Sequence, residues 1–155
     1  MVVLLIEMTK MEEKSFNELC ELLGHCEKGS DEEFEIYKRM VELAEKEIAE
    51  LEDDEEDSLE LPTGESVRCV PDFLDHYAAP MDNLSQIYIK RKEYAKALPL
   101  LEQVLPIYRT LENFDPDYTY QRVYATERMI ECLKQLGKNA LATLYGYELR
   151  QLKTS

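Results

Sequence analysis

Residues 83–108 read NLSQIYIKRKEYAKALPLLEQVLPIY and carry the clearest structural signal in the chain. From Tyr94 onward the apolar residues return every three or four positions, which places them on one face of an α-helix. The members of this stripe are Tyr94, Ala97, Leu98, Leu101, Val104, Leu105, Tyr108 and Leu111. Pro106 lacks the amide that would bond the Glu102 carbonyl, so we expect a bend in this helix and no break.

Helical signals continue on both sides of this segment. Gly137 suits a left-handed helix cap, and Asn139 suits the first position of the next helix. The resulting prediction is four helices in the C-terminal half, over residues 72–91, 93–112, 117–136 and 139–153. Further upstream, Ser30 and Glu33 have the spacing of a capping box, and they precede a helix predicted over residues 31–52.

The predicted organisation has three parts. Residues 1–52 form an N-terminal helical hairpin, residues 53–71 an acidic loop, and residues 72–155 a helical array. The middle part begins with DDEED and contains Pro62, Gly64 and Pro71, a composition typical of a solvated linker. Only five glycines, many good helix formers and little alternating β-branched sequence make the fold class all-α.

The charge of the chain is divided unevenly. Residues 1–80 hold 7 Lys or Arg against 24 Asp or Glu, whereas residues 81–155 hold 11 against 9. An acidic half without a basic stripe argues against binding to nucleic acid and to anionic membranes. It would attract a basic protein partner instead.

The chemistry-bearing residues are few. Cys20, Cys26, Cys69 and Cys132 are too irregular for a secreted disulfide framework, so we expect reduced, buried thiols and a cytoplasmic location. Cys20 and Cys26 diverge around a helix, which disfavours zinc. No phosphate-binding loop or nucleophile motif is present, so we expect no catalysis, no metal and no cofactor. Ser30 and Ser58 lie beside acidic residues, and their phosphorylation is left open.

Residues 83–108 resemble most of a tetratricopeptide repeat. The signature slots hold Met81, Leu84, Ser85, Tyr88, Tyr94, Ala97, Leu101 and Val104. The phrase ALPL and the spacer containing Asp115-Pro116-Asp117 are most similar to repeats of the kinesin-light-chain type. A weaker second unit has Met129, Ile130, Leu133, Ala142 and Leu149 in the signature slots. Two positions depart from the family pattern. Thr126 stands where a large residue is usual in the second unit, and Lys92 replaces the usual turn glycine in the first.

This resemblance implies antiparallel helical hairpins stacked as a short α-solenoid, with residues 1–52 as a degenerate third unit. Its first helices would line a surface that binds a protein or peptide. The implied partner-binding residues are Asp82, Asn83, Gln86, Ile89, Lys90, Tyr124, Glu127, Arg128 and Glu131. Asp82 and Gln86 depart from the clamp for chaperone tails, so a C-terminal carboxylate ligand is not expected.

The function that follows is a non-catalytic adaptor or assembly subunit. Assembly into a homo- or hetero-oligomer is left open, because two stacked units alone would leave an apolar end uncovered. The alternative is an accessory helical domain of a larger enzyme, such as a methyltransferase of the SET/MYND type, whose helical C-terminal part looks similar.

Overall fold

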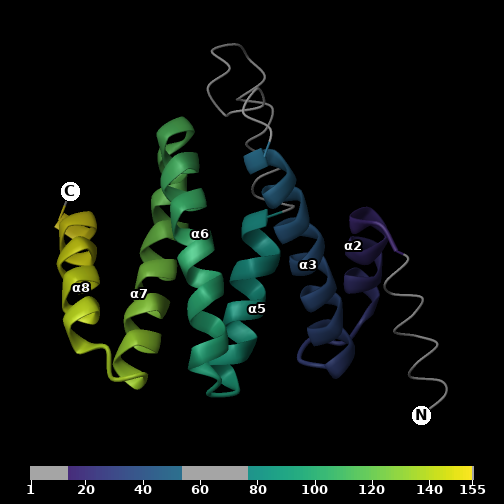
Figure 1. Cartoon of the computed structure of the whole chain (residues 1–155), viewed down its shortest axis with the longest axis horizontal. Helices are drawn as coiled ribbons and strands as arrows, with labels where there is room; N and C mark the ends of the chain where they lie inside the picture. Colours follow the sequence, from purple (N-terminus) through teal and green to yellow (C-terminus); the bar gives the residue numbers. More distant parts are fainter. Residues whose placement is uncertain (1–13, 54–76, 155) are drawn as a thin grey trace. The chain divides into compact units, whose positions relative to one another are not determined.

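The computed structural model describes residues 14–53 and 77–154, and within them it contains helices and no strands. The prediction of an all-α fold is confirmed. The helices are α2 (Phe16–His25), α3 (Asp31–Asp53), α5 (Ala79–Lys90), α6 (Tyr94–Phe114), α7 (Thr119–Gln135) and α8 (Asn139–Thr154), with a short 3-10 helix, η3 (Pro116–Tyr118), before α7. Their order along the chain can be followed in Figure 1.

The chain forms two compact units, residues 1–61 and 62–155. The division falls inside the segment predicted as an acidic loop. Residues 54–71 of that loop, the first five residues of the helix predicted from residue 72, and both Ser58 and Cys69 lie outside the described residues.

In the first unit, α2 and α3 pack against each other around Phe16, Leu19, Ile36 and Met40. The predicted cap at Ser30 is present, since the Ser30 hydroxyl accepts from the Glu33 amide at 3.2 Å. The reciprocal half of the predicted box differs, because the Glu33 carboxylate accepts from the Gly29 amide and not from Ser30. A complete capping box that sequence analysis missed, between Ser15 and Glu18, begins α2.

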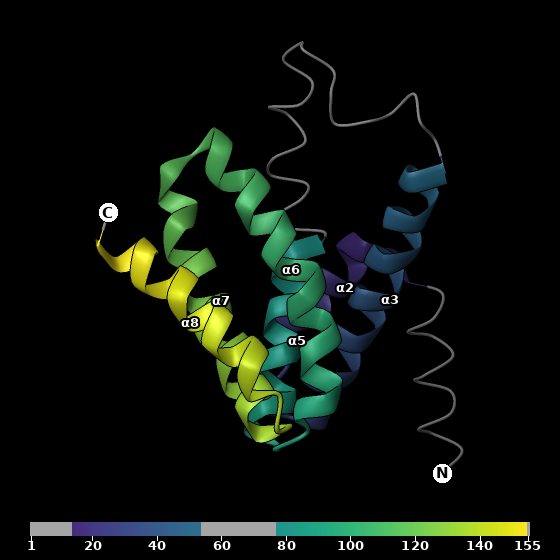
Figure 2. The ribbon, with the colours of Figure 1, turned by 60° about the vertical axis from the view of Figure 1, so that its left-hand side comes forward.

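In the second unit, α5, α6, α7 and α8 lie side by side in chain order, each antiparallel to the next (Figures 1 and 2). The core between them is made by Met81, Leu84, Ala97, Leu98, Leu101, Val104, Leu105, Tyr108, Leu111, Ala125, Met129, Cys132, Leu133 and Ala142. The predicted α6 stripe is therefore buried, except that Tyr94 is only half-buried. The helix runs unbroken through Pro99 and Pro106, because tertiary packing on two sides outweighs the missing hydrogen bonds.

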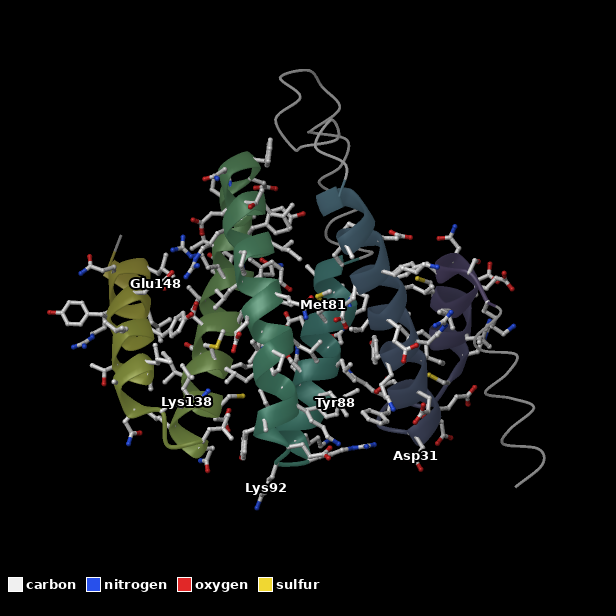
Figure 3. All side chains as sticks on the ribbon, in the orientation of Figure 1. Asp31, Met81, Tyr88, Lys92, Lys138 and Glu148 are labelled. Carbon is white, nitrogen blue, oxygen red and sulfur yellow. The ribbon has the colours of Figure 1, made fainter. Side chains whose placement is uncertain are left out.

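The turns that follow α5 and α7 have the same geometry. Lys92 and Gly137 both adopt a left-handed backbone, with φ of 62° and 77°. In each turn the next amide reaches back five residues, from Glu93 to the Tyr88 carbonyl and from Lys138 to the Leu133 carbonyl, both at 2.8 Å. This is the Schellman arrangement, and it recurs 45 residues later in the chain. Lys92 and Lys138 mark the two turns at the same end of the helices in Figure 3.

Candidate functional site

A buried hydrogen-bond network joins α5, α6 and α7. Asp82 on α5 is only 8% exposed, and its carboxylate accepts a hydrogen bond of 2.7 Å from the Tyr108 hydroxyl on α6. Arg128 on α7 donates to the other carboxylate oxygen and forms an ion pair with it. Burial and the neighbouring Asp82 carboxylate both raise the pKa of Tyr108, so its hydroxyl remains a donor. The network fixes the spacing of α5 and α7, the two helices expected to carry the partner surface.

Five of the nine expected surface residues are exposed, and four of them are the polar residues Gln86, Lys90, Glu127 and Glu131. Gln86 follows Asp82 by one turn on α5, and Glu131 follows Arg128 by nearly one turn on α7. Both helices run in the same direction (Figure 1), so each of these residues follows the Asp82–Arg128 ion pair toward the C-terminal end of its helix. Lys90 and Glu127 are also exposed. The surface therefore presents polar groups of both signs on a fixed frame.

The remaining expected residues differ in their access to solvent. Asn83 and Ile89 on α5 are half-buried. Arg128 has most of its side chain covered, and its guanidinium is engaged by Asp82. Asp82 and Arg128 thus bind each other, and we assign them a positioning role at this surface. Sequence reasoning counted Tyr108 only as a core residue, because a helical stripe gives no sign of which hydroxyl meets a carboxylate.

Aromatic side chains extend the surface along α7. Tyr124 is 54% exposed and lies one turn before Arg128. Tyr120, one turn further, is also exposed, although sequence analysis did not include it among the partner-binding residues. Tyrosines four residues apart on a helix share one face, and their combination of apolar ring and hydroxyl suits contact with another protein. We use the name α5–α7 surface for Gln86, Lys90, Tyr120, Tyr124, Glu127 and Glu131.

A second ionic cluster joins α6, α7 and α8. Arg109 and Arg122 both donate to Glu148, at 2.8 Å each, and Arg122 also donates to Glu112 at 2.7 Å. Burial would raise the pKa of Glu148, but the hydrogen bonds from the two arginines outweigh it and lower this pKa. The four charges cancel, so the cluster fastens the three helices without adding net charge. No local pattern could have revealed it, because its members come from three helices.

The chemistry-bearing residues considered in the sequence analysis were the cysteines and the groups that could bind a metal. Among residues 14–53 and 77–154 no three His, Cys, Asp or Glu side chains gather where they could hold a metal ion. The expectation of buried thiols is correct for Cys132, whose burial raises its pKa to about 11, and wrong for Cys20, which is exposed. Cys26 is half-buried, since the end of α2 leaves one side of it open.

None of the described helices has the length and apolar character that crossing a bilayer requires. Comparison of the chain with protein-family models, with curated proteins and with solved structures gave no match.

Proposed function

We propose that this chain is a non-catalytic interaction module, an adaptor or assembly subunit that binds a protein or peptide through the α5–α7 surface. The observation that carries the proposal is the half-exposed Tyr124, one turn from the Asp82–Arg128 ion pair. Exposed tyrosine on a rigid frame is a favourable anchor, since little conformational entropy is lost when it is covered. The mixed charges of Lys90, Glu127 and Glu131 would set the orientation of the partner.

We further propose that α5–α6 and α7–α8 are two repeats of the tetratricopeptide type. Two observations support this. The turns at Lys92 and Gly137 share one hydrogen-bond pattern 45 residues apart. Residues at the same spacing share burial as well, as in the pairs Met81 and Thr126, Leu84 and Met129, and Ala97 and Ala142. In such a repeat, alternate helices line one surface, which is the relation of α5 and α7 here.

The test is affinity capture with matched variants, followed by mass spectrometry. Immobilised wild-type chain, Tyr124→Ala and Tyr147→Ala would be compared in the same extract. Tyr147 is the control because it is similarly exposed but lies on α8. We expect a protein that is retained by the wild type and by Tyr147→Ala, and depleted about tenfold or more by Tyr124→Ala, which corresponds to a lost anchor of about 1.4 kcal/mol. If every captured protein is insensitive to Tyr124, the α5–α7 surface is not the binding surface.

A further inference from the structure

A groove with a volume of about 380 Å³ opens between α6 and α8, on a part of the array distinct from the α5–α7 surface. Its floor is Met129 and Leu133 of α7, which are buried beneath it. Leu105 and Pro106 form the α6 wall, and Leu141 of α8 faces them while remaining 46% exposed. The volume lies within the range of pockets that bind ligands, and the lining is mainly apolar.

Three side chains that line the groove are polar: Arg109 and Tyr145 can donate hydrogen bonds, and Glu102 supplies the carboxylate acceptor. Glu102 lies exposed at its edge, and no hydrogen bond or ion pair within the described residues engages its carboxylate. The Glu102 carbonyl also lacks the usual donor four residues later, because that position is Pro106. A ligand with hydrogen-bond donors and positive charge would satisfy both groups.

The one cation of the groove is already compensated. Arg109 lies at the end toward the C-termini of α6 and α8, where its guanidinium donates to both carboxylate oxygens of Glu148, at 2.8 and 2.9 Å. Glu148 and Arg109 therefore close that end of the groove as an ion pair. The net electrostatic character that remains is the negative charge of Glu102, above an apolar floor.

We propose that this groove binds a peptide segment in which a large apolar side chain is followed by a lysine or arginine. The apolar side chain enters between Leu105 and Leu141 and covers Met129, and the basic side chain reaches Glu102. A partner anchored here would leave the α5–α7 surface accessible, so the two sites can be occupied together. This site stands independently of the function proposed above.

The test uses two small probes, N-acetyl-Phe-Lys-amide and N-acetyl-Phe-Glu-amide, titrated into the methyl-labelled full chain and followed by NMR. The lysine probe should shift the methyl signals of Leu105, Met129 and Leu141 saturably, and bind about three- to fivefold more tightly than the glutamate probe. Glu102→Lys should reverse that preference. Asp117→Lys, the same change of charge at an exposed site outside the groove, should preserve it.

The proposed contact with the apolar side chain of the peptide is tested by Leu141→Gln, with Leu144→Gln as its control. Leu144 is more exposed, at 66%, lies on the same helix and does not line the groove. Binding of the lysine probe should weaken about fivefold or more in the first variant and little in the second. The proposal is overturned if neither probe shifts the groove methyls, if Glu102→Lys leaves the preference unchanged, or if dilution alone shifts them, because a second copy of the chain would then occupy the groove.

Discussion

Replacing Asp82 by asparagine should test the frame on which the α5–α7 surface depends. The substitution keeps the size of the side chain and one acceptor, but removes the negative charge shared by Tyr108 and Arg128. A hydrogen bond to a charged group contributes about 1.5–3 kcal/mol. Tyr108 is only 2% exposed and cannot turn to water, whereas the Arg128 side chain is 20% exposed and regains part of its hydration. We therefore expect a loss of about 2 kcal/mol, below the 3–5 kcal/mol typical of a fully buried pair.

The assay is urea unfolding of the full chain, followed by circular dichroism and by amide exchange within α5 and α7. Tyr108→Phe removes one hydrogen bond to the carboxylate and leaves the ion pair, so about 1.5 kcal/mol is expected, the lower end of the range for a hydrogen bond to a charged group. The double variant should cost less than the sum of the two. Asp117→Asn, at an exposed aspartate, is the control and should stay within about 0.5 kcal/mol of the wild type. An Asp82→Asn variant as stable as that control would refute the reasoning, because the carboxylate would then contribute nothing to packing.

Three further predictions concern stability. Leu101→Ala should cost about 2–5 kcal/mol, as for other emptied core leucines, since Leu101 is fully buried; an unchanged thermal melt would contradict this. Gly137→Ala should destabilise the fold by about 1 kcal/mol, and only through its left-handed backbone, because an added Cβ meets nothing within 4 Å. Lys92 has the same left-handed backbone, so Lys92→Gly should be neutral or stabilising by up to about 1 kcal/mol in urea titrations. Glu148 has a lowered pKa in the folded chain, so its contribution to stability is complete above the ordinary value of 4.5 and is lost as the pH falls through the folded pKa. Thermal melts of the wild type and of Glu148→Gln from pH 6 to pH 2 should show that the variant lacks this part of the acid dependence.

Much of the fold can be predicted from the spacing of apolar residues and from the residues that cap helices or form turns. The helix predicted over residues 93–112 is α6, Tyr94–Phe114, because its apolar stripe repeats without interruption and the Asp115-Pro116-Asp117 spacer follows it. The end of α7 and the start of α8 were placed to within a residue by Gly137 and Asn139. These features depend on neighbours in sequence, so a single chain is sufficient to predict them.

The candidate site was less accessible to sequence reasoning. Helical spacing correctly brings Gln86, Lys90, Glu127 and Glu131 to solvent, but cannot decide that Asp82 is buried against Tyr108. That outcome depends on the distance between three helices, which is a property of packing. The same reason explains why the cluster around Glu148 and the groove beside Leu141 were not foreseen. Tyr120 lies outside residues 124–131, the part of α7 that the resemblance assigned to the surface, and composition alone left its exposure open.

The order in which the helices pack has a consequence for how this part of the chain gains and loses its structure. In the described second unit the extensive contacts join α5 to α6, α6 to α7 and α7 to α8, so most partners are separated by a single connection. Such low sequence separation is typical of domains that fold in microseconds to milliseconds. A pulling force applied at Thr154 would act on α8 first, then on α7, and last on α6 and α5. We expect α8 to detach first as one step once the bonds from Arg109 and Arg122 to Glu148 break, and the helices joined by Asp82 to resist higher loads.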